Sequence, residues 1–196
     1  LFGDGSDYGI KISYEIQNVP RGIAEGIIIA EKFLSNSSCV FILGDNLFIG
    51  DLTYKKYKKL LESDDGACVF TYKVKDPHRY GILEFNSKNK VVKIVEKPKE
   101  PKSNNAITGL YFYDKDAAKI AKTLTPSKRN ELEITDLNNK YLLNNKLSFE
   151  MLDDSATWLD AGTISSLYEA SNLISAIEKR NGSKIGCIEI ASFKMN

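Results

Sequence analysis

Two aspartates in this sequence stand where a short apolar segment meets a turn that contains glycine, an arrangement that could bind a metal ion. Asp45 lies in "FILGDNLFIG", directly after an apolar run and Gly44, and Asp160 lies in "TWLDAGT". Both positions would stand at the carboxyl end of a strand, the edge where ligands bind in open α/β sheets. Two carboxylates that converge there are what Mg²⁺ requires when substrate phosphates and water supply its other ligands. The sequence therefore predicts a shared magnesium site.

A structural interpretation of each aspartate competes with this one. Asp and Asn often cap helices and turns, so either residue alone is weak evidence for a metal site. The pair is stronger evidence, because two strand-like segments far apart in the chain end in the same way. At the level of the residues both interpretations stay open.

Two further motifs could contact a phosphorylated substrate. Glu96 and Lys97 end an alternating apolar segment, and Pro98 stops it. The carboxylate could accept hydrogen bonds from hydroxyl groups and the ammonium group could meet a phosphate, although a salt-bridged tip of an exposed edge strand is the simpler alternative. The "VPRG" segment at 19–22 precedes a helical pattern, so its backbone amides could hydrogen-bond a base or a phosphate.

Hydrophobic periodicity predicts the elements that would position these residues. Residues 12–16 alternate like a half-buried strand, and a helix over 22–33 would place Ile23, Ile27, Ala30 and Phe33 near one face. With a strand at 38–43 these segments form a βαβ pattern, which favours parallel pairing. The further expected elements are a helix at 52–65, a strand at 66–74, a hairpin at 81–97, a strand at 106–114 with a bulge or close approach at Gly109, helices at 115–124 and 133–144, strands at 146–152 and 156–162, and a helix at 163–180 capped by Thr163.

This order predicts a single α/β domain over residues 1–196, with a mostly parallel sheet and antiparallel insertions. The net charge is +1, with 27 basic and 26 acidic residues scattered along the chain, so we expect neither nucleic acid nor a membrane as a partner. The cysteines Cys39, Cys68 and Cys187 are far apart and form no zinc or disulfide pattern, which favours reduced thiols in a cytoplasmic protein. The only histidine, His78, lies in a polar segment typical of a surface loop.

Several segments together resemble one enzyme family, glucose-1-phosphate thymidylyltransferase, in their order and spacing. "LGDN" and "EKP" recur across sugar nucleotidyltransferases, whereas "SNNAITGLYFYD" and "ELEITDLN" favour the thymidylyl branch; "QNVPRGIAEGIIIAEKF", "DPHRYGILEFN" and "WLDAGTISSLYEASN" fit it too. The resemblance implies a Rossmann-like sheet flanked by helices, of the nucleotide-diphospho-sugar transferase type. It also implies transfer of a thymidylyl group from dTTP to glucose 1-phosphate, with release of pyrophosphate, Mg²⁺ as cofactor, and a homo-oligomer that by family precedent is a tetramer.

The resemblance further implies roles for individual positions. Asp45 and Asp160 match the magnesium ligands and, with Lys97, the catalytic residues. Glu96 matches the residue that holds sugar hydroxyls, while Lys97 meets a phosphate. The other matched positions recognise or enclose the base (Gln17, Pro20, Gly22 and Ile23) or form the sugar-phosphate site and its walls (Tyr80, Gly81, Ile107, Gly109, Tyr111 and Trp158).

One part of the family pattern has no counterpart in this sequence. Family members open with a strand and a glycine-rich loop that carries an arginine, followed by a lysine, and these grip the triphosphate. We therefore expect the domain to be incomplete at its N-terminus by at least one βαβ unit, roughly 30 residues, and short at its C-terminus. Two alternatives to the transferase follow: a non-catalytic module that binds sugar nucleotides, and a related transferase that uses UTP.

Overall fold

The computed structural model describes residues 2–50, 62, 65–153, 155–187 and 190. Contacts divide the chain into two compact units, a larger one of residues 15–44 and 48–158 and a smaller one of residues 1–14, 45–47 and 159–196. The single domain expected over 1–196 stays a prediction. The helix expected at 52–65 lies outside the described residues, apart from 62 and 65.

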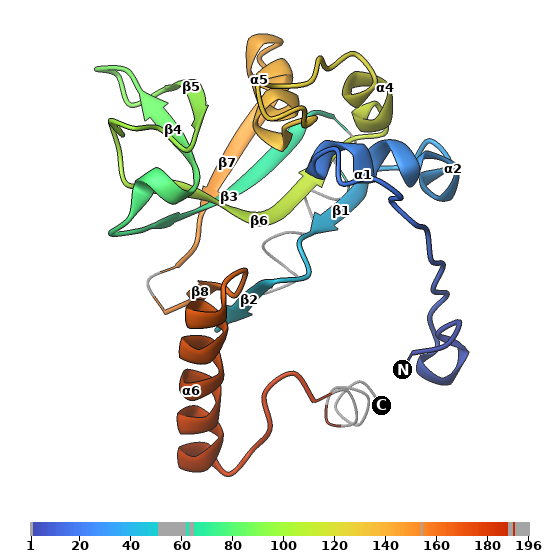
Figure 1. Cartoon of the computed structure of the whole chain (residues 1–196), viewed down its shortest axis with the longest axis vertical. Helices are drawn as coiled ribbons and strands as arrows, with labels where there is room; N and C mark the ends of the chain where they lie inside the picture. Colours follow the sequence, from blue (N-terminus) through green and yellow to red (C-terminus); the bar gives the residue numbers. More distant parts are fainter. Residues whose placement is uncertain (1, 51–61, 63–64, 154, 188–189, 191–196) are drawn as a thin grey trace. The chain divides into compact units, whose positions relative to one another are not determined.

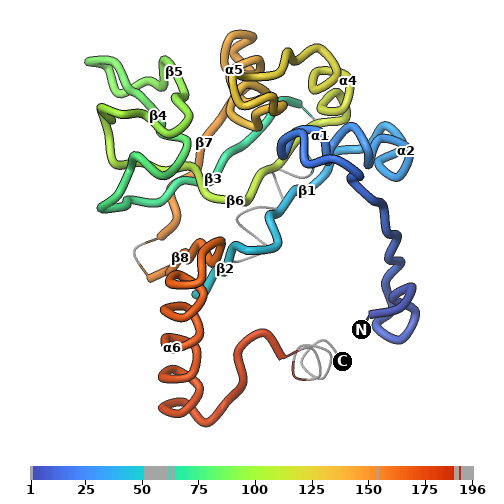
Figure 2. The backbone as a smooth tube through the Cα atoms, in the orientation of Figure 1, coloured from blue at the N-terminus to red at the C-terminus, as the bar shows by residue number. Residues whose placement is uncertain are grey.

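The larger unit is built on a six-stranded sheet in the order β5-β4-β6-β3-β7, with β1 also paired to β6. Figure 1 shows α1, α4 and α5 on the same side of this sheet, and Figure 2 traces the same path of the backbone. The strands are β1 (Cys39–Ile42), β3 (Ala67–Lys73), β4 (Gly81–Phe85), β5 (Val91–Glu96), β6 (Asn105–Tyr113) and β7 (Leu147–Met151). The helices are α1 (Ile23–Ile29), α2 (Glu31–Leu34), α4 (Ala117–Ala121), α5 (Ile134–Leu143) and the short 3₁₀ turn η2 (Pro77–Arg79). The expected α/β class is confirmed.

Neighbouring strands are more often antiparallel than the sequence predicted. β6 runs antiparallel to β1, β3 and β4, and β5 is antiparallel to β4. Among the strand pairs of this six-stranded sheet only β3 and β7 are parallel. Since β6 lies antiparallel between β1 and β3, these two strands and β7 still point the same way. Periodicity identified the strands, but it carries no information on which strand inserts between two others.

The alternating segment at 12–16 does not form the predicted strand. It pairs with no strand in the part of the chain that the structure describes, and Tyr14 and Ile16 are 69% and 77% exposed. The predicted parallel βαβ pairing is therefore wrong, and β1 hydrogen-bonds to β6 instead. Alternation produces a strand only where a neighbouring backbone supplies the ladder of hydrogen bonds.

The helix predicted over 22–33 is present as two helices, α1 and α2, with Ala30 between them. Its buried face differs from the prediction: Ala24 and Ile27 are buried, while Ile23 and Phe33 are exposed. Gly26 faces β1, since a Cβ there would lie at an ordinary van der Waals distance of 3.6 Å from the ring of Phe41. The side of the helix that is buried is set by this contact with the sheet.

A buried polar network joins β6 to α5. The hydroxyl of Tyr141 donates to Asp114 Oδ1 at 2.6 Å, and the backbone N–H of Gly66 donates to Asp114 Oδ2 at 2.8 Å. Tyr113 donates its hydroxyl to Asn138 Oδ1 at 2.7 Å. Burial raises the pKa of both tyrosines, so that they remain protonated hydrogen-bond donors. Apolar side chains pack around this network, including those of Ala24, Ile27, Val69, Leu83, Ile94, Ala117, Ile134 and Leu137.

The smaller unit contains the 3₁₀ turn η1 (Ser6–Tyr8) and the long helix α6 (Ile164–Asn181). The expected cap of this helix is confirmed: Thr163 Oγ1 accepts from the Ser166 N–H, and Ser166 Oγ accepts from the Thr163 N–H, both at 3.1 Å. Strands β2 (Asn46–Ile49) and β8 (Thr157–Asp160) pair as a separate two-stranded sheet. No helix in the described ranges is long and apolar enough to cross a membrane.

No disulfide bond involves Cys39, Cys68 or Cys187. Cys68 is buried in β3, and this burial raises the pKa of its thiol to about 11. At neutral pH it is therefore a protonated, apolar core side chain.

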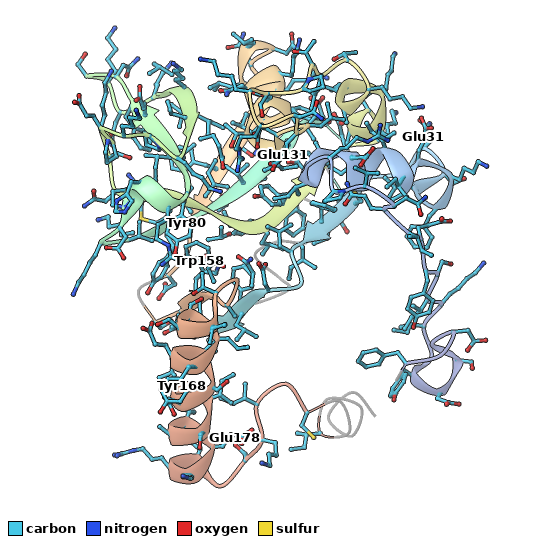
Figure 3. The ribbon with its side chains drawn as sticks, viewed as in Figure 1. Glu31, Tyr80, Glu131, Trp158, Tyr168 and Glu178 are labelled. Atoms are coloured by element: carbon cyan, nitrogen blue, oxygen red, sulfur yellow. The ribbon has the colours of Figure 1, made fainter. Side chains whose placement is uncertain are left out.

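We predict that Tyr141→Phe lowers the free energy of unfolding by about 1–3 kcal/mol, because the 5% exposed Asp114 loses a hydrogen-bond donor. Urea unfolding would measure the change. The control is Tyr168→Phe on α6, where the ring is 69% exposed (Figure 3) and the change in stability should be close to zero. Equal midpoints for Tyr141→Phe and the unaltered protein would contradict a stabilising role for the network.

Candidate active site

The carboxylates of Asp45 and Asp160 converge on Gly162, and all three residues belong to the smaller unit. A Cβ at Gly162 would lie 3.0 Å from Asp45 Oδ2 and 3.0 Å from Asp160 Oδ1. One oxygen of each carboxylate therefore faces the space that the missing side chain leaves. The backbone N–H of Ala161 donates to the carbonyl oxygen of Asp45 at 2.8 Å, which holds the two segments together. The structure thus brings together the two aspartates that the sequence singled out.

Neutral donors orient both carboxylates. Asn46 Nδ2 donates to Asp45 Oδ1 at 2.8 Å, and the N–H of Gly162 donates to Asp160 Oδ1 at 3.0 Å. No cluster of three or more Asp, Glu, His or Cys side chains suited to a metal is found in the described part of the chain. Two carboxylates beside an open position fit Mg²⁺, a hard cation that keeps water and substrate oxygens as further ligands.

Glu96, at the end of β5, lies opposite Gly81 on β4. The hydroxyl of Thr135 donates to Glu96 Oε2 at 2.6 Å. A Cβ at Gly81 would lie 3.1 Å from Thr135 Oγ1, 3.4 Å from Glu96 Oε2 and 4.0 Å from Ile107 Cδ1. The absence of a side chain at position 81 therefore makes room for the contact between Glu96 and Thr135, and it places three predicted site residues next to one another.

Two cations face the other oxygen of Glu96. Lys97 Nζ lies 3.9 Å and Arg129 Nη2 lies 3.7 Å from Glu96 Oε1. Arg129 is held mainly by Glu133, which accepts from Nε at 3.1 Å and from Nη2 at 2.8 Å. These bonds raise the pKa of Arg129. Lys97 adopts a left-handed backbone conformation, with φ of 43°, and its N–H donates to the carbonyl oxygen of Tyr80 at 3.0 Å.

Sequence reasoning did not assign site roles to Thr135, Arg129 or Glu133. All three lie in "RNELEITDLN", a segment that sequence analysis treated only as a mark of family resemblance. The density of charged and hydroxyl residues there was a signal, but the contact with Glu96 joins residues far apart in the chain. The tertiary structure was needed to place them.

Aromatic side chains adjoin the Tyr80 end of this cluster. The rings of Tyr80 and Trp158 (Figure 3) meet edge to face at a centroid distance of 5.0 Å. The ring of Tyr72 lies 6.1 Å from that of Trp158. The guanidinium of Arg79 lies 5.3 Å from the centre of the Tyr80 ring. The structure therefore brings the predicted neighbours Tyr80 and Trp158 together.

The three β6 residues predicted to form the sugar-phosphate site differ in their contacts. Ile107 is buried and borders Gly81, while Gly109 lies where the register between β3 and β6 shifts, as predicted. The carbonyl oxygen of Gly109 accepts from the N–H of Leu43 at 2.9 Å. Tyr111 is buried in the core, where its ring stacks on that of Tyr113 at 5.9 Å. Tyr111 therefore supports the strand from within the core.

The predicted base-binding residues occupy the loop before α1 and the first residue of that helix. Gln17 Nε2 donates to the carbonyl oxygen of Gly22 at 3.2 Å and to Glu25 Oε2 at 2.5 Å. Gly22 has a φ of 101°, and a Cβ there would overlap the backbone of Leu132, so glycine is required. Pro20 and Ile23 are exposed on either side of this glycine.

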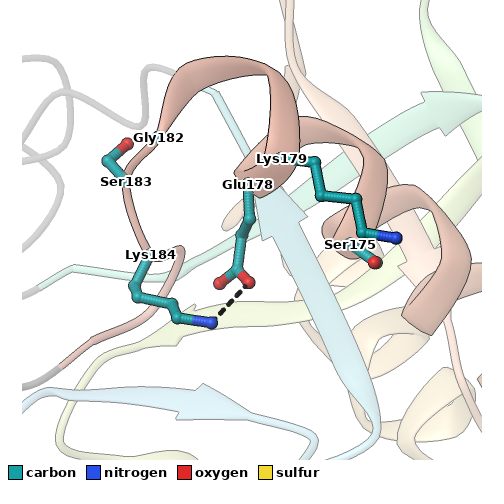
Figure 4. Close-up of a pocket in the computed structure, with 6 residues that line it drawn as sticks. All are labelled: Ser175, Glu178, Lys179, Gly182, Ser183 and Lys184. Carbon is teal, nitrogen blue, oxygen red and sulfur yellow. Dashed lines mark hydrogen bonds and ion pairs between the residues drawn. The ribbon is translucent and has the colours of Figure 1, made fainter.

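None of the predicted site residues lines either of two further hollows. One, of about 300 Å³, lies beside α5 and is lined by Thr123, Leu124, Thr125, Asp136, Asn139, Lys140 and Leu143. The other, of about 390 Å³, lies at the C-terminal end of α6 and is lined by Ser175, Glu178, Lys179, Gly182, Ser183 and Lys184 (Figure 4). In the second hollow Lys184 Nζ lies 3.0 Å from Glu178 Oε2, so these charges neutralise each other.

Relatives of known function cover nearly the whole chain. Glucose-1-phosphate thymidylyltransferase of Neisseria meningitidis serogroup A is 46% identical over 189 residues, which are 96% of this chain and 66% of that protein. The enzyme of the same name from Xanthomonas campestris pv. campestris is 44% identical over 98% of this chain and 65% of its own length. The chain thus spans just under two thirds of the length of these curated relatives.

Solved structures agree with the expected fold class. A structure assigned as a glucose-1-phosphate thymidylyltransferase from Bacillus anthracis, in complex with sucrose, superposes with a TM-score of 0.79 at 40% identity, over 88% of this chain and 68% of that one. UDP-glucose pyrophosphorylase complexed with UDP-glucose gives 0.73 at 25% identity, over 86% and 66%. These neighbours have the nucleotide-diphospho-sugar transferase fold, so that prediction is confirmed.

A family model described as nucleotidyl transferase matches residues 1–176. The matched range contains the paired aspartates, the cluster around Glu96 and the loop that carries Gln17. The chain therefore belongs to the nucleotidyl transferase family.

Proposed function

We propose that the protein transfers a thymidylyl group from dTTP to glucose 1-phosphate, giving dTDP-glucose and pyrophosphate. The observation that carries this proposal is the convergence of Asp45 and Asp160 on the space beside Gly162. Similarity to known enzymes supports the choice of reaction, because curated relatives at 38–46% identity are named glucose-1-phosphate thymidylyltransferases.

This reaction needs no general base. A phosphate oxygen of glucose 1-phosphate is already anionic; it attacks the α-phosphorus of dTTP, and the bond from that phosphorus to the leaving pyrophosphate breaks. The rate then depends on alignment of the two substrates and on stabilisation of charge on the triphosphate. The exposed position of His78, the only histidine of the chain, is consistent with such chemistry.

Asp45 and Asp160 would hold Mg²⁺, which when bound supplies positive charge to the triphosphate oxygens. Asn46 and the N–H of Gly162 fix the two carboxylates by hydrogen bonds, so that they are oriented before the ion arrives. The missing side chain at Gly162 leaves the space between them open. Preorganised ligands of this kind reduce the rearrangement needed on binding.

Glu96 would bind sugar hydroxyls and Lys97 would contact the sugar phosphate. Thr135 holds Glu96 Oε2, while the carboxylate keeps further lone pairs for hydroxyl donors. The pair between Lys97 and Glu96 is long and exposed, so it constrains the ammonium group weakly and leaves it able to turn to a phosphate. In the same proposal the sugar-phosphate site and its walls are formed by Tyr80, Gly81, Ile107, Gly109, Tyr111 and Trp158. The base is bound by Gln17, Pro20, Gly22 and Ile23.

A transferase that uses UTP is the second candidate, and the similarity to a UDP-glucose pyrophosphorylase bound to UDP-glucose favours it. A non-catalytic module that binds sugar nucleotides is the alternative from another functional class. Assembly as a homotetramer rests on the family resemblance, and a cytoplasmic location rests on the lack of a disulfide or zinc pattern among the cysteines. Both remain predictions.

Phosphorus NMR on the full-length protein with dTTP, glucose 1-phosphate and Mg²⁺ tests the reaction directly. We expect the signals of pyrophosphate and of a sugar-nucleotide diphosphate to grow together. Faster product formation with UTP than with dTTP would favour the second candidate. Broadening of added dTDP-glucose signals without turnover would favour the non-catalytic module.

We predict that Asp45→Asn, Asp160→Asn and Gly162→Ala each lower turnover by roughly 100-fold or more, since each disturbs the stabilisation of charge in the transition state. Each should also weaken binding of Mn²⁺, used as a paramagnetic probe and followed by EPR. The matched control is Asp7→Asn in the exposed turn η1, which should change neither quantity. Mn²⁺ binding that persists unchanged in both Asp45→Asn and Asp160→Asn would show that the metal does not bind at this site.

We predict that Glu96→Gln raises the KM for glucose 1-phosphate by roughly 10- to 100-fold, because a charged acceptor for hydroxyls is lost. The KM for dTTP should change little, and steady-state kinetics would measure both. Glu84→Gln is the control, because Glu84 lies on the neighbouring strand β4 and pairs with Lys102 at 3.7 Å. A similar rise in both KM values would indicate a general structural defect and count against sugar recognition by Glu96.

A further inference from the structure

The side-chain amide of Gln17 is held by two groups that can only accept hydrogen bonds. Its Nε2 donates to the carbonyl oxygen of Gly22 at 3.2 Å and to Glu25 Oε2 at 2.5 Å. A backbone carbonyl and an ionised carboxylate have no proton to donate, so the NH₂ end of the amide must face them. Gln17 Oε1 accepts no hydrogen bond from any residue that the structure describes, and it is left for a donor outside the chain.

Glu25 is suited to hold this orientation. It is 8% exposed and lies in the first turn of α1. Its second oxygen, Oε1, pairs with Arg21 Nη2 at 2.7 Å. The hydrogen bond from Gln17 is the main cause that lowers the pKa of Glu25, so the carboxylate is ionised at neutral pH and remains an acceptor.

The backbone of Leu132 holds the loop before α1 in place. The N–H of Leu132 donates to the carbonyl oxygen of Arg21 at 2.7 Å, and the N–H of Ala24 donates to the carbonyl oxygen of Leu132 at 3.2 Å. Gly22 packs against the same backbone. The acceptor carbonyl of Gly22 and the first turn of α1 are therefore fixed relative to each other, and both acceptors of the Gln17 amide are in place before any ligand binds.

We propose that Glu25 is a positioning residue that selects the nucleobase by fixing Gln17 with its carbonyl oxygen toward the ligand. The inference rests on the proposed function, because it takes the base to be held at Gln17. A carbonyl oxygen there accepts from a ring N–H, which thymine and uracil present at N3. Cytosine presents a lone pair at N3, so two acceptors would face each other. This contact excludes cytosine and does not separate thymine from uracil.

Glu25→Gln tests the role with little change in shape. A glutamine at 25 can donate as well as accept, so the Gln17 amide can turn over and offer its NH₂ group to cytosine. We expect the unaltered protein to bind dTMP roughly 10- to 100-fold more tightly than dCMP, from the cost of an unpaired acceptor. In Glu25→Gln this ratio should fall by about tenfold. Titrations followed by NMR would measure the four dissociation constants.

Glu31→Gln on α2 is the matched control, because Glu31 is exposed and pairs with Lys122. It should leave the ratio of dTMP to dCMP affinity unchanged. A structural defect in Glu25→Gln would weaken both nucleotides alike, so the ratio separates positioning from folding. An unchanged ratio in folded Glu25→Gln would overturn the role of Glu25.

A measurement on the unaltered protein covers the case in which Glu25→Gln does not fold. Addition of dTMP should shift the ¹³Cδ carbonyl signal of Gln17, because Oε1 gains a donor, while its NH₂ signals stay close to their free positions. Movement of the NH₂ signals with a stationary carbonyl would overturn the inference.

The same experiments distinguish failure of this inference from failure of the proposed function. Turnover of dTTP and glucose 1-phosphate without any preference for dTMP over dCMP would leave the transferase standing and make the role of Glu25 wrong. Absence of both turnover and dTMP binding would overturn the two together.

Discussion

The larger unit depends on one backbone arrangement, the antiparallel insertion of β6 between β1 and β3. Hydrogen bonds along both edges of β6 fix where Ile107 stands beside Gly81 and where the register shifts at Gly109. Directly after the strand, Asp114 accepts hydrogen bonds from Tyr141 on α5 and from Gly66 before β3. Because ladder bonds and buried polar bonds must all be satisfied together, a slip of β6 would disturb the core and the Glu96 cluster at once.

Three glycines make room for contacts in the clusters described above. Gly22 packs on the backbone of Leu132, Gly81 leaves space for the contact of Glu96 with Thr135, and Gly162 leaves space between two aspartates. Only Gly22 among these is required by a left-handed backbone conformation. At the other two the constraint is the volume of a methyl group, which would lie 3.0–3.4 Å from side-chain oxygens and would require those oxygens to shift by a few tenths of an ångström.

Neutral donors make described hydrogen bonds to each of the acidic groups proposed to meet ligands. Asp45 accepts from an asparagine amide, Asp160 from a backbone N–H, and Glu96 from a threonine hydroxyl at 2.6 Å. The cations near Glu96 stand farther away, at 3.7 Å and 3.9 Å. A neutral donor orients a carboxylate but leaves its charge in place, so the group can still attract a metal ion or accept from several hydroxyls. A close ion pair would compete with the ligand for that charge.

The sequence by itself determined features that near neighbours in the chain decide: most of the strand positions, the Thr163 cap, the register shift at Gly109 and the two aspartates beside turns. It also carried the family resemblance, since whole segments match in order. Tertiary structure alone decided that residues 12–16 form no strand, which face of α1 is buried, that Thr135 and Arg129 reach Glu96, and which way the Gln17 amide points. Each of these depends on a hydrogen-bond partner or packing surface supplied by distant residues, and local periodicity carries no record of which distant groups will be adjacent.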